Sequence, residues 1–261
     1  MLMSMKEIND LYLRLSKIVI NIEDHVLQVA CVSKLIAEKL GYDKRIINMV
    51  GLFHDLGFSA PEFVNQIQKK KSMEKATAKD WLVIDKRNGK EHASKGALLS
   101  NFLPFLSDYE DVIFSHYSSA EELKESNISH YFANMICLAY SVSISFLTSE
   151  DINYSFIKNV RSNIENSTLF FDTLKKAFLE ISRYEEFWWS LENRKLLEDE
   201  LLGDTEDRLI SLKELDAFAN LVIFLVDTKS SFTRYHTQRI VHVSKKLVES
   251  FLERKESTKC K

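Results

Sequence analysis

Apolar side chains recur at helical spacing along most of this chain. In one predicted helix, His25, Val29 and Ile36 share a face, and Gly41 follows as a residue suited to the C-terminal cap. His25 is therefore expected to point along the buried side of this helix. Taken alone, a histidine in such a place is more often a hydrogen-bonded core residue than a ligand.

A second predicted helix begins at Asp43, whose side chain suits the N-cap position, and it is apolar on nearly all sides. It ends within residues 50–57, where an imidazole and a carboxylate, His54 and Asp55, are adjacent. Burying an unpaired charge costs several kcal/mol, so something must compensate the pair if it lies inside the protein, and a metal ion is the simplest candidate. The other interpretation is a helix end that faces solvent, with Gly57 as its cap.

Further helices are expected along the rest of the chain, over residues 5–22, 92–106, 108–117, 129–149, 211–226 and between 151 and 202. His92 opens one of them, with Gly96 on the same face to admit a close neighbour. His116 ends a buried stripe in another. Residues 59–88 are expected to form short helices and loop.

Composition favours an almost entirely helical chain, and the expected fold is an all-α helical bundle with additional C-terminal helices. Only six Gly and two Pro occur among 261 residues, so residues that break helices are scarce. The hydrophobic share of 45% and the charged share of 28% are typical of a globular protein. The net charge of −3 argues against a nucleic-acid polymer as a partner.

The cysteines and the apolar segments indicate in which cellular compartment the protein is expected to work. Cys31, Cys137 and Cys260 fit neither a disulfide framework nor a zinc spacing, which favours a reducing compartment, the cytoplasm. The first 15 residues contain no apolar signal core. The longest uncharged stretch, 131–149, contains one Asn and four Ser, so a buried helix is expected there and no membrane span.

The chain is expected to divide at its best linker candidate, residues 203–207. Residues 1–202 would form one domain with a C-terminal helical extension, and residues 203–261 a linker and the first helices of a second, incomplete copy. An internal echo that aligns His25 with His236 supports the copy. It pairs Val29 with Ile240, Val32 with Val243, Ser33 with Ser244 and Lys34 with Lys245. The alternatives are chance similarity between amphipathic helices and a longer parent protein that continues the copy.

Four histidines and one aspartate fall at helix ends on predicted inward faces: His25, His54, Asp55, His92 and His116. Apart from the adjacent pair they lie on separate helices, which is hard to explain for unrelated core residues. Imidazole and carboxylate ligands together suit Fe, Mn or Zn, and a helix bundle can direct side chains from several helices at one interior point. The pattern therefore predicts a metal site.

In order and spacing these motifs resemble the HD superfamily of metal-dependent phosphohydrolases, and most closely its HD-GYP branch, which hydrolyses cyclic dinucleotides such as cyclic di-GMP. The resemblance covers about residues 21–149. Its supports are LFHDLG at 52–57, HASKGA at 92–97, His116 and the stretch 139–149, and residues 232–240 also resemble the start of such a domain. It implies that His54 and Asp55 are catalytic. It also implies a divalent transition metal, such as Fe or Mn, on His25, His54, Asp55, His92 and His116.

The chain also departs from the family's pattern. Phe58 stands where the family has a Lys that contacts phosphate, and Tyr117 where it has the second of two adjacent histidines. Residues 118–127 contain neither Gly nor Pro, so the Gly-Tyr-Pro signature is missing, and Ser141 stands in place of a late metal-binding Asp. A full two- or three-metal centre is therefore not expected, and the alternatives are a single ion or none.

If the site is active, the resemblance implies hydrolysis of a phosphoester of a nucleotide or cyclic dinucleotide by water that a metal ion activates. Asp55 would bind metal and orient the nucleophile. Lys95 and the run Lys69, Lys70 and Lys71 are candidate phosphate contacts, although such a run is usually a solvated face. The competing hypothesis is a catalytically degenerate domain that senses a ligand or holds partners together, for instance in a homo-oligomer.

Overall fold

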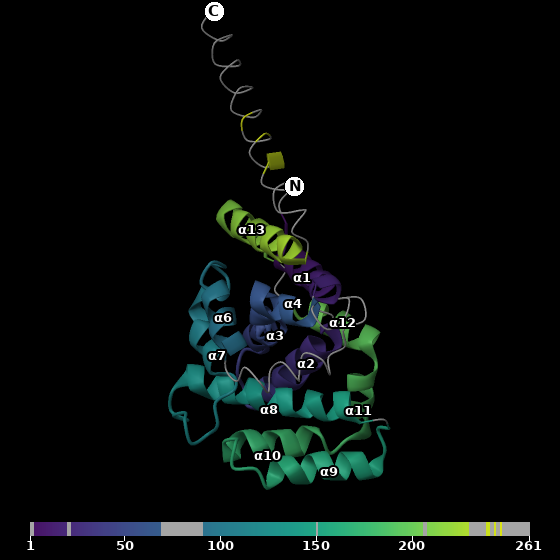
Figure 1. Cartoon of the computed structure of the whole chain (residues 1–261). Coiled ribbons are helices and arrows are strands. Elements are labelled where there is room, and N and C mark those ends of the chain that lie inside the picture. Colours follow the sequence, from purple (N-terminus) through teal and green to yellow (C-terminus); the bar gives the residue numbers. More distant parts are fainter. Residues whose placement is uncertain are drawn as a thin grey trace, which may run out of the picture.

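The computed structural model describes residues 3–19, 22–68, 91–149, 151–205 and 208–229, together with positions 239, 240, 243 and 246. In these parts, regular structure other than helix is limited to an isolated bridge between Ser4 and Leu209, which confirms the all-α prediction (Figure 1). The α-helices are α1 (Met5–Val19), α2 (Glu23–Lys39), α3 (Lys44–Phe53), α4 (Pro61–Gln68), α6 (Glu91–Ser100), α7 (Glu110–Ser115), α8 (Ile128–Thr148), α9 (Tyr154–Glu165), α10 (Asp172–Ile181), α11 (Glu185–Glu192), α12 (Arg194–Gly203) and α13 (Leu212–Lys229). Short 3-10 helices are η1 (Leu56–Ser59) and η3 (Ser107–Tyr109).

Helix α2 lies at the centre of the fold, where it packs against both α3 and α8 (Figure 1). Its residues are buried along most of its length, because apolar side chains occur on nearly every side of it. Helices α6 and α7 pack together at one end of this core, and α1 contacts α13 at another edge. Helices α9 and α10 lie beyond α8, at the bottom of the view.

The close packing of α3 on α2 depends on Gly51. A Cβ atom at Gly51 would lie 2.7 Å from the Cα atom of Ala30, closer than side chains are found to approach. The predicted N-cap of α3 is confirmed, because the Asp43 carboxylate accepts a hydrogen bond from the Arg45 backbone N–H at 2.9 Å. Gly41 follows α2 with φ 78°, the left-handed conformation expected of its capping role.

Buried polar contacts attach the C-terminal extension to the core. The Lys34 side chain, 1% exposed, forms ion pairs with Glu200 at 2.6 Å and with Asp204 at 2.8 Å. An ammonium group at this depth needs such partners because its desolvation is costly. Asn48 of α3 donates to the carbonyl oxygen of Leu201 at 2.8 Å. Asp204 belongs to the predicted linker, so the start of that linker is held against α2.

The observed ends of α1 and α6 and the burial of α8 can be compared with what the sequence predicts. Helix α1 spans Met5–Val19 of the described residues, and Ile22, its predicted end, is already the N-cap of α2. Helix α6 ends at Ser100 instead of residue 106. Pro104 follows closely and disfavours helix in the residue before it. By length and composition α8 could cross a membrane, but 56% of its hydrophobic window is buried inside the protein, as predicted for a core helix. The echo residue His236 lies outside the described residues.

Candidate metal centre

Five side chains meet in the interior of the core, and each comes from a helix end. His25 lies in the first turn of α2, while His54 and Asp55 directly follow α3. His92 is the second residue of α6, and His116 directly follows α7. None of the five is more than 4% exposed. The structure thus brings together all of the histidines and the carboxylate that the sequence predicts as ligands.

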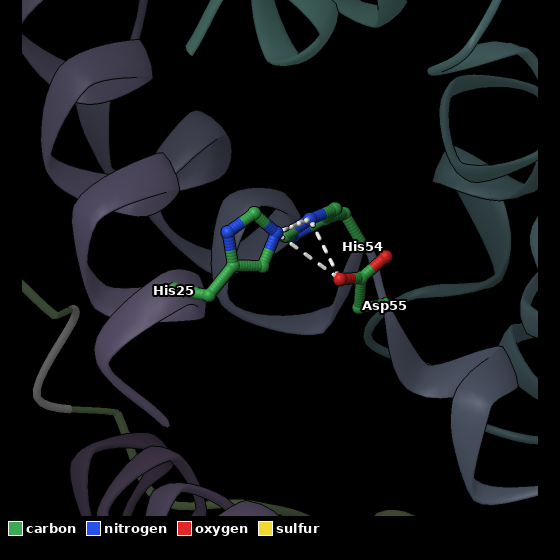
Figure 2. Close-up of side chains that lie close together, drawn as sticks. All are labelled: His25, His54 and Asp55. Atoms are coloured by element: carbon green, nitrogen blue, oxygen red, sulfur yellow. Dashed lines mark hydrogen bonds and ion pairs between the residues drawn. The ribbon is translucent and has the colours of Figure 1, made fainter. Parts of the chain in front are cut away.

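One imidazole pair, His25 and His54, faces one oxygen of the Asp55 carboxylate (Figure 2). Asp55 Oδ2 lies 3.2 Å from His25 Nε2 and 3.3 Å from His54 Nε2. The two Nε2 atoms are 3.3 Å apart. We refer to His25, His54 and Asp55 Oδ2 as the first half-site.

A second imidazole pair, His92 and His116, faces the other carboxylate oxygen. Asp55 Oδ1 lies 3.4 Å from His92 Nε2 and 3.8 Å from His116 Nε2, and the two Nε2 atoms are 3.3 Å apart. We refer to these groups as the second half-site. In each half-site the three ligand atoms lie within 4.8 Å of one another, which is compact enough to hold a metal ion. Asp55 is shared between the half-sites.

Hydrogen-bond partners determine where the histidine protons lie. His54 Nδ1 is 2.7 Å from the carbonyl oxygen of Gly51, and His116 Nδ1 is 2.5 Å from that of Ile113. A carbonyl oxygen can only accept, so each Nδ1 carries the proton and donates it. In the neutral form of each ring, Nε2 then presents a lone pair toward Asp55, as a metal ligand must.

A proton or a metal ion is needed between the ring nitrogens of each imidazole pair. Acceptor atoms 3.3 Å apart repel each other unless a proton or a metal ion lies between them. In addition, the Oδ1 atom of Asp55 is buried and accepts no well-formed hydrogen bond from the described residues. The donor types and their spacing therefore fit a divalent ion in either half-site.

Electrostatics favour the metal-binding forms of Asp55 and His116. Burial raises the pKa of Asp55, but the surrounding imidazoles, His54 first among them, outweigh burial and hold this pKa well below its usual value. Burial lowers the pKa of His116 well below its usual value, and the neighbouring imidazoles of His54 and His92 add to the effect. Asp55 is thus ionised and His116 neutral near pH 7, as metal binding requires.

Aromatic rings enclose the second half-site. Phe58 stacks on His92, with ring centroids 4.2 Å apart and ring planes 5° from parallel. Tyr117 packs edge-on against His92 and His116, with centroid distances of 4.8 and 4.6 Å. Phe58 and Tyr117, which stand where the family has Lys and His, therefore pack their rings against the ligand imidazoles.

Tyr140 of α8 faces the first half-site. Its ring lies edge-on to His25 with centroids 5.0 Å apart, and 4.9 Å from the ring of Tyr117. Ser141, expected at the position of the late Asp, donates its hydroxyl to the carbonyl oxygen of Cys137 at 3.0 Å. Consecutive residues of a helix point about 100° apart, so Tyr140 and not Ser141 takes the place beside the ligands.

Gly57 lets the turn after α3 approach α6. It does not cap α3, whose C-cap is His54. A Cβ atom at Gly57 would lie 1.8 Å from the carbonyl oxygen of His92, and one at Gly96 would lie 3.3 Å from the Gly57 nitrogen. The close approach predicted at Gly96 is thereby confirmed. Sequence reasoning missed this use of Gly57, although a glycine in each of the two histidine motifs was the available signal.

The candidate phosphate contacts are placed in part. Lys95 lies on α6 and forms an ion pair with Glu62 of α4 at 2.7 Å, with 36% of the Lys95 side chain exposed. The remaining candidates, Lys69, Lys70 and Lys71, lie outside the described residues. The role of all four lysines toward phosphate stays a prediction.

Residues 22–136, which include all five ligand residues, match the sequence model of the HD domain family. These residues form an HD domain. The chain is also 25% identical over 178 residues to the 3'3'-cGAMP-specific phosphodiesterase 1 of Vibrio cholerae, and the match covers 62% of this chain and 41% of that protein. The chain thus spans about two fifths of the length of this relative. No solved structure matches the chain significantly.

Proposed function

We propose that this HD domain is a metal-dependent phosphohydrolase that acts on a phosphoester of a nucleotide or a cyclic dinucleotide. HD domains bind divalent metals, and the match over residues 22–136 supports phosphohydrolase chemistry at the level of the family. The observation that carries the proposal is the Asp55 carboxylate, which lies between two pairs of buried imidazoles. The matched relative is named for 3'3'-cGAMP, which supports a cyclic dinucleotide as the substrate class.

Each half-site is suited to one ion, and Asp55 would serve both. This is more than the alternatives of a single ion or none that the missing histidine and late Asp left open, because two imidazoles remain on each side of the carboxylate. Fe or Mn suits such a mixture of imidazole and carboxylate ligands. When bound, a divalent ion supplies Lewis-acid chemistry that activates water and polarises a phosphoryl group.

The site is enclosed, so a reaction would require access for the substrate and cations to offset its phosphate charge. Because the five ligands are at most 4% exposed, side chains around them would have to shift before a phosphoryl group could reach them. Phe58 brings no charge to the position where the family has Lys. Lys95 and residues 69–71 are therefore the cations proposed to offset phosphate charge.

The same enclosure favours a second candidate function, a catalytically degenerate domain that senses a ligand or binds a partner. Phe58 and Tyr117 pack directly on the imidazoles of the second half-site, and Tyr140 packs on His25. A domain that holds metal only for structural or regulatory reasons needs no entry for a phosphoester. The two candidate functions differ in turnover, whereas metal binding is common to both.

Three broader proposals accompany this function. The cysteine pattern supports work in the cytoplasm. The echo between His25 and His236 supports a second HD-like unit that begins within residues 203–261. A homo-oligomer is proposed as a partner, whereas a membrane or a nucleic-acid polymer is not.

Metal analysis combined with turnover tests the proposal. The protein is loaded with Mn²⁺ or Fe²⁺, and hydrolysis of 3'3'-cGAMP, cyclic di-GMP and bis(p-nitrophenyl) phosphate is measured for wild type and for the double variant His54→Ala, Asp55→Ala. We expect bound metal and turnover in wild type and neither in the double variant. A wild-type protein that binds no transition metal would refute the metal centre. Equal rates in both proteins would place the activity elsewhere, and metal binding without turnover would favour the degenerate domain.

A further inference from the structure

We propose that Gln28 and Ser143 are positioning residues of the metal centre, which hold the imidazole of His25 in the tautomer that can bind metal. This inference rests on the proposed metal site. It concerns a chain of buried side chains that connects His25 to helix α11 of the C-terminal extension.

The chain consists of three consecutive hydrogen bonds. His25 Nδ1 lies 2.9 Å from Ser143 Oγ of α8, and the Ser143 hydroxyl donates to Gln28 Oε1 at 2.7 Å. Gln28 Nε2 in turn donates to the carbonyl oxygen of Leu191 at 3.1 Å. Ser143 is fully buried and Gln28 is 8% exposed, so water does not compete for these groups.

The carbonyl group at the far end sets the direction of every proton in this chain. The Leu191 carbonyl can only accept, so the amide nitrogen of Gln28 faces it and the amide oxygen faces Ser143. That oxygen can only accept, so it takes the proton of the Ser143 hydroxyl. Ser143 Oγ is then left as the acceptor for His25 Nδ1–H, and His25 Nε2 presents its lone pair to the first half-site.

His25 needs such a chain because of its place in the fold. His54 and His116 follow their helices, where the carbonyl groups of Gly51 and Ile113, three residues earlier, accept their Nδ1 protons directly. His25 lies in the first turn of α2, and the carbonyl of Ile22, three residues earlier, accepts the backbone N–H of Val26. The hydroxyl of Ser143, on α8, therefore stands in for a backbone carbonyl as the partner of His25 Nδ1. Unlike a carbonyl, a hydroxyl can also donate, so a further acceptor must hold its proton away from the imidazole.

The central variant is Gln28→Met, which removes that acceptor and leaves Ser143 intact. The freed hydroxyl can then donate to His25 Nδ1, which moves the imidazole proton to Nε2, where it opposes a metal ion. Loss of an outer-sphere partner of a metal-binding histidine typically lowers metal affinity about 10–100-fold, and we expect a loss in this range for one ion per chain. Gln28→Glu retains an oxygen acceptor toward Ser143, so we expect affinity within about threefold of wild type, well below that range.

Two measurements test the inference independently. Nitrogen-15 NMR of the metal-free protein, with signals assigned through His25→Gln, reports the tautomer of His25. Competition with a chelator, read from the EPR signal of free Mn²⁺, reports affinity. Matched controls are Ser141→Ala and Ser145→Ala, because these hydroxyls donate to carbonyl groups of their own helix. Circular dichroism establishes that each variant keeps its helix content.

We expect the Nδ1–H tautomer in wild type, Gln28→Glu and both controls, and a shift toward Nε2–H with weaker Mn²⁺ binding in Gln28→Met. An unchanged tautomer in Gln28→Met would overturn the inference, as would Mn²⁺ affinity equal to that of wild type. If wild type binds no Mn²⁺, the proposed metal centre fails, while the NMR result still decides how His25 is held. Ser143→Ala provides a second variant should Gln28→Met not fold, with the same expected loss of Mn²⁺ affinity.

Discussion

The two half-sites around Asp55 hold their histidines by different means. In the second, a carbonyl group of the same helix end fixes His116, and the ring of Phe58 packs on His92. In the first, His54 is fixed in the same local way, but His25 depends on side chains of α8 and α2 and, through them, on α11. Local contacts form wherever the helix forms, whereas contacts between helices require the assembled fold. The first half-site is therefore the one that should respond to changes in the C-terminal extension.

The largest effect is expected at the residue that both half-sites share. Asp55→Asn keeps the shape of the side chain but removes its charge, so both half-sites should lose metal. The loss should exceed the about 10–100-fold that outer-sphere changes cost, because the ligand itself is altered. Plasma mass spectrometry after dialysis measures the bound metal, and Asp111→Asn on the exposed side of α7 is the matched control. One ion retained at full affinity would show that the half-sites do not share Asp55.

The second half-site should be the more sensitive to the packing of α6 against η1. In Gly57→Ala the new methyl group would collide with the backbone of His92, and overpacking of this kind typically costs about 1–3 kcal/mol or more. Urea unfolding of the metal-free protein measures the cost. Gly203→Ala, where a Cβ atom meets nothing within 4 Å, should leave stability nearly unchanged. Equal stability of Gly57→Ala and wild type would mean that η1 and α6 do not pack as described.

Acid should destabilise the metal-free protein through His116. Its pKa in the folded protein lies below 6.5, so the unfolded chain binds more protons below that pH and the free energy of unfolding falls as the pH falls. One such group contributes at most about 1.4 kcal/mol per pH unit. The depressed pKa of Asp55 acts in the same direction, but its stabilisation is lost only below pH 3.8.

Urea unfolding between pH 7 and pH 5 tests this dependence. His116→Gln should reduce the slope of unfolding free energy against pH, whereas Ser126→Ala, at an exposed position before α8, should retain it. An identical slope in wild type and His116→Gln would show that His116 is not held neutral by the fold.

The smallest effect should come from the ring stacked on His92. An aromatic pair contributes about 0.5–1.5 kcal/mol beyond its buried area, so Phe58→Leu should weaken the second half-site by roughly 2–12-fold. The first half-site should keep its Mn²⁺ affinity, since Phe58 stacks on an imidazole of the other pair. Two-step chelator titration separates the two affinities, and an equal loss in both steps would contradict the division into half-sites.

The ligand residues were predictable because helical periodicity assigns a side chain to a face. His25 and His116 share faces with buried apolar positions, and the structure places both in the interior. The all-α fold followed from the scarcity of Gly and Pro. The membership of each imidazole pair was not predictable, because it depends on how four helix ends meet in space.

The supporting residues around the ligands were harder to predict for a different physical reason. Ser143 and Gln28 are two among several polar residues of α8 and α2, and only their contact across these helices gives them a role. Tyr140 and Ser141 are neighbours in sequence, so a one-residue difference in alignment exchanges the residue that faces the centre. To tell which residue of a helix faces the centre, the rotation of that helix about its axis must be known. The spacing of apolar residues alone determines this rotation too coarsely.

Anomalous diffraction from crystals of the Mn²⁺-loaded wild-type protein tests the central claim most directly, because it locates each ion relative to Asp55. The two-half-site arrangement predicts two peaks per chain, one beside His25 and His54 and the other beside His92 and His116. They should lie about 3.5–4 Å apart, the separation usual for two-metal hydrolytic sites. A single peak, or no peak beside the Asp55 carboxylate, would contradict the claim that Asp55 joins two metal-binding half-sites.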